Sequence, residues 1–404
     1  MNALAKRVAA FLHSPPRAVH APWALLWLSL TYLVVSTALL LHVVSDPQRA
    51  AKMTEKDSRQ YLQIAEAFAA GDFSMSYVQA RPHRQPLYPF LLAGAVRMAG
   101  GSLVALGMVN VLVGLFALWL VYFLVGELFA SPAVSFVVGF LFVTNRFIYG
   151  HVAGQLWTEP LFVFLSLLVL LFFLRYLASG RALHLAFASV ACGLAYLTRP
   201  NGLLMMAALL VSAAVYDFWH RRALRAVVRL GFGYAAALLL FAVITLPASL
   251  PRAEAFGRPF YHGHVSNFLW SDDYHTARAT KRLLTWRDYA ATHDLGDAVL
   301  RWLYGCWEVF VRIPLAVEIW AVLYALAVAG IWLALRSADA RFRYLLLFLL
   351  IQLVPLIWGI WAARSGRLPY AVMLPFLFVF AALALQNWSA RAAASLGSGR
   401  AAAS

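Results

Sequence analysis

The chain has few charged residues and almost no cysteine. Only 12% of its 404 residues are charged, about half the share of a typical soluble domain, whereas 63% are hydrophobic. This composition excludes a soluble enzyme, a nucleic-acid-binding module and a disordered chain. The two cysteines, Cys192 and Cys306, lie in apolar surroundings and provide neither a disulfide framework nor a metal-ligand spacing.

Three further features are missing. No glycine-rich loop of the Walker or Rossmann type is present, so a nucleotide-linked substrate at the cytoplasmic face is not expected. No repeat relates the two halves of the chain, and no predicted span has a charge at its midpoint. Transporters usually show both features, so their absence disfavours a transporter.

What the chain does contain is ten apolar runs, each near the ~20 residues that cross a bilayer. We therefore predict an all-α polytopic membrane protein, with one transmembrane domain over 1–388 and a disordered tail over 389–404. The run at 183–198 is short, and we expect it to be tilted or partly re-entrant. The runs lie at about 22–44, 102–125, 132–150, 158–178, 183–198, 202–218, 230–248, 314–335, 343–361 and 369–388.

The net charge of +16 reflects basic residues in short stretches between these runs. Basic loops lie on the cytoplasmic side of a membrane, so ten spans place both termini there. The inner side then holds 14 basic and 3 acidic residues, and the outer side 19 and 14. Because most carboxylates lie outside, we expect the polar chemistry in two long outer segments, at about 45–101 and 249–313.

The first outer segment contains a predicted amphipathic helix over 54–70, in which Tyr61 starts an apolar stripe at helical spacing. Such a helix should lie at the membrane interface. Thr54 and Asp57 fit a capping box, and Asp57 also continues the apolar stripe. Asp57 is therefore either a helix cap or a carboxylate that faces a reaction chamber at the membrane surface.

Two arginines, Arg81 and Arg84, follow in a proline-braced turn before another short apolar helix. A guanidinium fork matches phosphate oxygens. Near a carboxylate at the membrane surface, this pattern suits an anionic lipid headgroup.

These motifs, taken in order, resemble the GT-C membrane glycosyltransferases, in particular the bacterial members of the protein mannosyltransferase family and the lipid A aminoarabinose transferases. The resemblance covers nearly the whole chain. It rests on Glu55-Lys56-Asp57 with Tyr61, Arg84-Gln85-Pro86-Leu87-Tyr88-Pro89, Thr158-Glu159-Pro160-Leu161, Leu197-Thr198-Arg199-Pro200-Asn201-Gly202 and Gly366-Arg367-Leu368-Pro369.

The resemblance implies an enzyme that transfers a sugar from a polyprenyl-phosphate carrier to a lipid, glycan or protein acceptor, with inversion, at the outer side of the membrane. Asp57 matches the family's first-loop catalytic aspartate, the general base. Arg84 lies where the aminoarabinose transferases have a basic residue that contacts the carrier phosphate. This chain has Ser58 where a second acid is common, so Glu55 becomes a candidate second carboxylate.

Further candidates for substrate or phosphate binding are Tyr61, Arg81, Glu159, Arg199, Arg364 and Arg367. For Arg199, Arg364 and Arg367, the alternative role is anchoring at lipid headgroups. For Glu159, the alternative role is helix capping. His262-Gly263-His264 lacks a third ligand, and we predict no metal ligands. A requirement for a divalent cation stays open.

The preferred interpretation is a glycosyltransferase of the bacterial inner membrane with its active site facing the periplasm. A flippase or transporter of lipid-linked sugars is one alternative, and an O-antigen polymerase or ligase is another. The first-loop carboxylate argues against the second, which more often concentrates arginines and histidines in late outer loops.

The predicted topology can be tested with a reporter that is active only outside the cytoplasm. Fused after residue 404, this reporter should be silent, because ten crossings return the chain to the cytoplasm. The same reporter within 249–313 serves as the positive control. Activity after residue 404 would mean a miscounted span, with 183–198 the first suspect.

Overall fold

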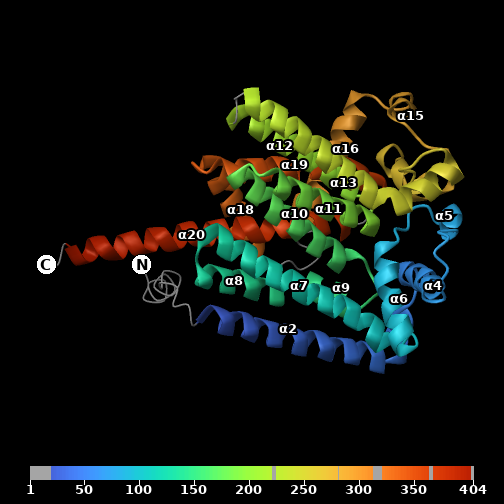
Figure 1. The fold of residues 1–404 in the computed structure, drawn as a ribbon, viewed down its shortest axis with the longest axis horizontal. Coiled ribbons are helices and arrows are strands. Elements are labelled where there is room, and N and C mark those ends of the chain that lie inside the picture. The colour runs from blue at the N-terminus through green and yellow to red at the C-terminus, as the bar shows by residue number, and fades with distance from the viewer. Residues whose placement is uncertain (1–19, 221–223, 281, 313–320, 364–366, 402–404) are drawn as a thin grey trace.

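A computed structural model describes residues 20–220, 224–280, 282–312, 321–363 and 367–401. Within these ranges the chain forms helices and no strands, as the sequence predicts (Figure 1). The helices outside the long bundle are α3 (Pro47–Met53), α4 (Asp57–Ala69), α5 (Tyr77–Ala80), α6 (Leu87–Ala99), α9 (Arg146–Ala153), the 3₁₀ helix η1 (Gly263–Leu269), α14 (Tyr274–Ala279), α15 (Trp286–Ala290), α16 (Leu295–Trp307) and the π-helical turn η2 (Glu308–Arg312).

The bundle helices correspond to the apolar runs of the sequence. Among the described residues, seven are long and apolar enough to cross a membrane, and three shorter ones join them. The ten-span count itself stays a prediction. The seven are α2 (His20–Ser45), α7 (Leu103–Phe129), α10 (Glu159–Ser179), α12 (Gly202–His220), α13 (Leu224–Phe256), α19 (Ala340–Ala363) and α20 (Arg367–Ala401), and the three are α8 (Pro132–Val143), α11 (Ala182–Thr198) and α18 (Ala321–Arg336).

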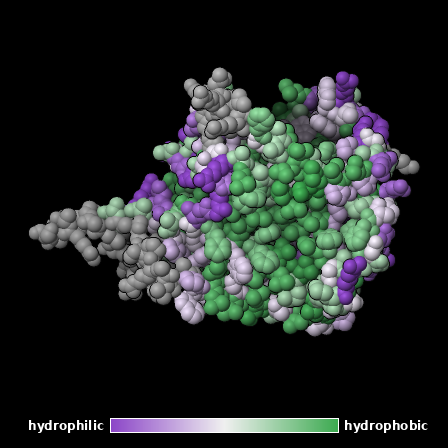
Figure 2. Space-filling view, in the orientation of Figure 1, coloured by the Kyte–Doolittle hydropathy of each residue, from purple (hydrophilic) through white to green (hydrophobic). Residues whose placement is uncertain are grey.

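On the face shown in Figure 2, hydrophobic side chains form a broad band across the middle of the bundle, and hydrophilic ones gather toward its two ends. This distribution is that of an integral membrane protein. The start of α2 and the end of α20 lie at one end, whereas α4, α5 and α15 lie at the other (Figure 1). The short helices of both predicted outer segments therefore share one end of the bundle.

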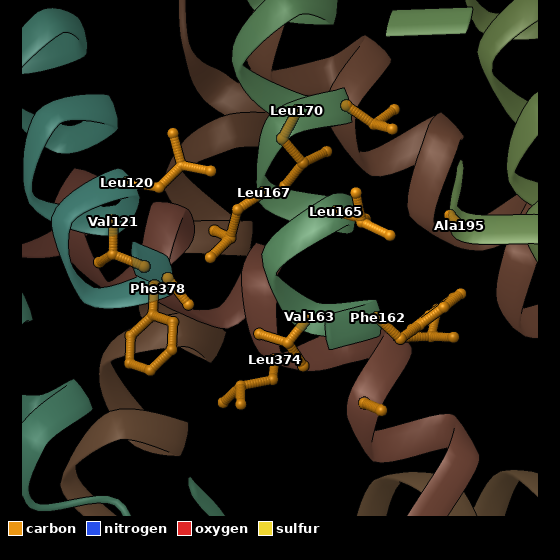
Figure 3. Close-up of a cluster of buried hydrophobic side chains, with 14 of the residues drawn as sticks. Leu120, Val121, Phe162, Val163, Leu165, Leu167, Leu170, Ala195, Leu374 and Phe378 are labelled. Atoms are coloured by element: carbon orange, nitrogen blue, oxygen red, sulfur yellow. The ribbon is translucent and has the colours of Figure 1, made fainter. Parts of the chain in front are cut away.

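The core is built around α10 and α20. The apolar part of α20 is 89% buried, against 28% for α2 at the edge. Leucine, valine and phenylalanine side chains of α10 interdigitate with those of α7, α11 and α20 (Figure 3). Apolar lipid tails provide little drive for association, so close packing holds such helices together.

The predicted run 132–150 is two helices, not one. Helix α8 ends at Val143, and Asn145 starts α9 because its side chain accepts hydrogen bonds from the backbone N–H of Phe147 and Ile148. Asparagine is a preferred N-cap residue, so the break has a local cause that hydropathy does not detect.

The chain is also non-helical between α14 and α15. Here the backbone wraps around the buried Asn267, which donates to the carbonyls of Ala277, Thr280 and Arg282. A capping box between Thr285 and Asp288 then starts α15. Elsewhere, α20 is described as helix up to Ala401, and the division at residue 388 stays a prediction.

Gly330 provides a test of the core packing. A Cβ at this position on α18 would lie 1.8 Å from the backbone oxygen of Phe380 on α20, so the helices would have to separate. Gly330→Ala should cost about 1–3 kcal/mol and lower the melting temperature in detergent. Gly94→Ala on α6 is the control, because nothing lies within 4 Å of its Cβ position. Equal melting temperatures for the two variants would contradict the packing of α18 on α20.

Candidate functional site

Asp57 is the first residue of α4, and a sharp turn places it there. Thr54 ends α3 and donates its hydroxyl to the carbonyl of Ala51, so the predicted capping box between Thr54 and Asp57 is wrong. Lys56 precedes Asp57 with a φ of 51°, a left-handed conformation that is unfavourable for lysine. Strain of this kind often occurs at functional sites.

Asp57 forms an ion pair with Arg84, a contact that the sequence analysis did not predict. The guanidinium Nη2 lies 2.5 Å from Asp57 Oδ1, Nε donates to Gln60 Oε1 at 2.8 Å, and Nη1 donates to the hydroxyl of Tyr61 at 3.0 Å. The side chain of Arg84 is 10% exposed and that of Asp57 is 39% exposed. The Arg84 side chain is thus held by residues of α4, whereas the Asp57 carboxylate is partly exposed to solvent.

The surroundings of Arg84 keep its charge in place. Burial works to lower the pKa of the guanidinium, but Tyr61 and Asp57 beside it outweigh this effect and raise the pKa. The ring of Tyr61 also lies under the guanidinium carbon, 4.8 Å away, and meets the buried ring of Tyr88 edge-on.

A second ion pair joins two other predicted motifs. Arg199, after α11, lies 2.7 Å from Glu159 at the start of α10 and donates to the hydroxyl of Thr158 at 3.0 Å. The carboxylate of Glu159 is 3% exposed. Its charge is therefore compensated inside the protein by Arg199.

The two ion pairs lie next to one another. Ser58, the neighbour of Asp57, accepts a hydrogen bond from the backbone N–H of Leu156 just before α10. Burial works to lower the pKa of the Arg199 guanidinium, but Glu159, Tyr61 and Asp57 outweigh this and raise the pKa. We call Asp57, Tyr61, Arg84, Glu159 and Arg199 the Asp57 cluster.

Two other predicted site residues, Arg81 and Glu55, lie outside the Asp57 cluster. Arg81 donates to Gln63 on α4, one turn after the Gln60 that Arg84 bonds. Glu55 is exposed and lines a separate hollow with Arg59. Arg364 and the side chain of Arg367 lie outside the described residues, so their roles stay predictions.

Sequence reasoning missed the buried arginines of the second outer segment. Arg252, at the end of α13, donates to carbonyls of the turn that contains Arg84. Arg301, on α16, donates to the carbonyls of Phe268 and Trp358 and faces Asp272. Bonds from a side chain to a distant carbonyl leave no pattern in a sequence. Only the presence of arginine in an apolar stretch could have drawn attention to them.

An apolar groove lies beside this site. It is lined by side chains from α4 to α6, the end of α11 and the last turns of α13, among them Phe68, Phe73, Leu87, Phe90, Leu246 and Leu250. The groove reaches Pro86, two residues from Arg84. A hydrocarbon chain in the groove would therefore place an attached polar group near Arg84.

Buried His262 makes the site region sensitive to acid. Burial, and then Arg252 nearby, lower its pKa to about 3, whereas an unfolded histidine has a pKa near 6.5. Between these values the unfolded chain binds the extra proton, so stability falls as the pH drops below about 6.5, by about 2 kcal/mol at pH 5.

The melting temperature of the wild type should therefore fall between pH 7 and pH 5. In His262→Gln this fall should be smaller, because the titrating group is gone. His275→Gln, at an exposed position, is the control and should behave like the wild type. An identical acid shift in His262→Gln would show that His262 is not the group responsible.

Comparisons with known proteins agree with the resemblance of the motifs. The family model described as dolichyl-phosphate-mannose-protein mannosyltransferase matches residues 81–246. The undecaprenyl phosphate-alpha-4-amino-4-deoxy-L-arabinose arabinosyl transferase of Pseudomonas aeruginosa is 26% identical over 231 residues, which are 54% of this chain and 41% of that protein.

Solved structures show the same fold. The oligosaccharyltransferase of Archaeoglobus fulgidus in the apo form is 15% identical and has a TM-score of 0.56, over 88% of this chain and 50% of that one. Its complex with an inhibitory peptide and a dolichol-phosphate has a TM-score of 0.52 at 14% identity, over the same shares.

This chain thus spans about two fifths of its curated relative and half of the solved structures. In sequence and in fold, it resembles the GT-C membrane glycosyltransferases.

Proposed function

We propose that this protein transfers a sugar from a polyprenyl-phosphate carrier to an acceptor at the periplasmic face of the bacterial inner membrane. The observation that carries the proposal is the Asp57–Arg84 ion pair, which combines a partly exposed carboxylate with a buried guanidinium at the end of the bundle that carries α4 and α5. The similar proteins support the donor class, since their names refer to undecaprenyl phosphate and dolichyl phosphate.

The donor would bind across the boundary between the apolar groove and the Asp57 cluster. The groove suits an isoprenoid chain, because its walls are apolar side chains of α4, α6 and α13. Arg84 and Arg199 would meet the phosphate, since a guanidinium fork suits phosphate oxygens. Arg367, Arg364 and Arg81 stay candidates for further phosphate contacts.

The reaction is a substitution at the anomeric carbon. Asp57 takes the proton from the acceptor hydroxyl while its oxygen forms the new bond to that carbon. The bond from the carbon to the phosphate oxygen breaks on the opposite side, and its electron pair stays on the phosphate. Arg84 and Arg199 stabilise the charge that develops there. Attack and departure on opposite faces invert the configuration.

Arg84 connects the two halves of this reaction. Its Nη2 is bonded to Asp57, and a bound phosphate would compete for the same nitrogen. When Nη2 turns toward the phosphate, its bond to Asp57 Oδ1 would weaken, and that oxygen could accept the proton of the acceptor hydroxyl. Donor binding would thereby activate Asp57 before the acceptor arrives.

No step is assigned to a metal ion. Among the described residues, no group of three His, Cys, Asp or Glu side chains comes together, and Glu159 is bonded to Arg199. One structure of the archaeal oligosaccharyltransferase is a complex with Zn and sulfate. Asp57 with Glu55 as a second carboxylate would be the first ligands to examine in this chain.

The direct test of the base is Asp57→Asn. Asparagine keeps an oxygen that accepts from Arg84, so the variant should lose only about 1–2 kcal/mol of stability and insert normally. Loss of a positioned base typically costs about 10²–10⁴ in rate. We expect an almost inactive protein that still binds polyprenyl phosphate. Mass spectrometry of envelope glycolipids and glycoproteins, with and without the protein, provides the readout and identifies the product.

The matched control is Asp339→Asn at the other end of the bundle. Asp339 also pairs with an arginine at the surface, Arg341 at 2.6 Å, and it is 31% exposed. This variant should transfer sugar normally. Arg84→Ala should instead weaken donor binding and leave the base in place. Near-normal transfer by well-folded Asp57→Asn would refute the assignment of Asp57 as the base.

A further inference from the structure

Arg252 is a fully buried arginine whose donor nitrogens are all directed at backbone. It lies near the end of α13 with 0% of its surface exposed. Its Nε donates to the carbonyl of Pro82 at 3.0 Å, Nη2 to the carbonyl of Arg84 at 2.8 Å, and Nη1 to the carbonyl of Ala248 at 2.5 Å. These bonds connect the seventh apolar run to a turn about 170 residues earlier in the chain.

The turn that Arg252 holds is the one that carries Arg84. Its two acceptor carbonyls lie on either side of His83, so the planar fork fixes the backbone from which the Arg84 side chain leaves. The side chain of Arg84 is held separately, by Gln60, Tyr61 and Asp57 on α4. Arg84 is thus positioned from two directions, by α4 through its side chain and by α13 through its backbone.

The second outer segment closes over the same turn. His262 lies 3.5 Å from the side-chain nitrogen of Gln85. Gly263 has a φ of +59°, and a Cβ there would lie 3.0 Å from the ring of Pro82. The residues on both sides of Arg84 are therefore packed between α13 and the loop that follows it.

We propose that Arg252 is a positioning residue for the donor phosphate, which acts by holding the Pro82–Arg84 backbone so that the Arg84 guanidinium faces Asp57. This inference rests on the proposed function of the Asp57 cluster. Arg252 itself is enclosed, and each of its nitrogens already donates to a carbonyl, so its effect on substrate passes through Arg84.

The geometry of the fork makes the proposal specific. A guanidinium can bond three carbonyls in fixed directions, whereas a lysine ammonium is a compact charge on a flexible stem. Arg252→Lys would therefore keep the positive charge but lose most of the hydrogen bonds that hold the Pro82–Arg84 backbone. A displacement of about 1 Å in a positioned group can cost on the order of 10²-fold in rate, so even a loosened turn should be measurable.

The experiment compares Arg252→Gln and Arg252→Lys with the wild type by two readouts. Hydrogen exchange measured by mass spectrometry reports how firmly residues 81–88 are held, without any substrate. Steady-state transfer from a synthetic polyprenyl-phosphate sugar gives KM for the donor and kcat. In Arg252→Gln we expect exchange over 81–88 about tenfold faster and a donor KM raised about tenfold. Arg252→Lys should stay closer to Arg252→Gln than to the wild type, both in the logarithm of the exchange rate over 81–88 and in the logarithm of the donor KM.

Arg301→Gln is the matched control. Arg301 is also a buried arginine, 1% exposed, and it also donates to backbone carbonyls, but to those of η1 and α19. Its replacement should speed exchange over 263–272 and leave 81–88 unchanged. General loosening of the fold would instead speed exchange over 81–88 in both glutamine variants.

The outcomes separate this proposal from the proposed function. Unchanged exchange over 81–88 in Arg252→Gln, or complete recovery of KM in Arg252→Lys, would overturn the positioning role. The proposed function would be overturned if the wild type transferred sugar from no polyprenyl-phosphate donor. In that case, faster exchange in Arg252→Gln would still show that Arg252 braces the Arg84 turn.

Discussion

The arrangement at the end of the bundle that carries α4 and α5 depends on one interaction, the ion pair between Asp57 and Arg84. A buried guanidinium is costly unless its donors are satisfied, and this one is satisfied by an ion pair, two neutral acceptors and an aromatic ring. These partners all come from the first turns of α4. The strained turn at Lys56 and the close approach of α4 to the 81–85 turn follow from this requirement.

The Asp57 cluster is coupled to the centre of the bundle through α10. Glu159 begins this helix, and the side chains that follow it pack against α7, α11 and α20. The position of the Glu159–Arg199 pair is therefore fixed by the best-packed part of the molecule. The Asp57–Arg84 pair depends instead on short helices and on a turn, which require the additional support of Arg252.

Much of the fold could be read from the sequence, because burial in a membrane leaves long apolar runs. Five of the predicted site residues come together in the Asp57 cluster, namely Asp57, Tyr61, Arg84, Glu159 and Arg199. Local effects escaped prediction, such as the cap at Asn145 and the wrapping of 277–284 around Asn267. Arg252 also escaped, because a bond from a side chain to a carbonyl 168 residues away leaves no periodicity to detect.

The central position of α20 has a consequence for assembly. Because a ribosome makes the chain from its N-terminus, α10 enters the membrane long before the helix that covers one of its faces. Lipid tails can occupy that face meanwhile, since they are as apolar as the side chains that later replace them. The final bundle thus forms by exchange of lipid for protein around α10. A nascent chain that stalls before α20 would hold a membrane-compatible but incomplete core.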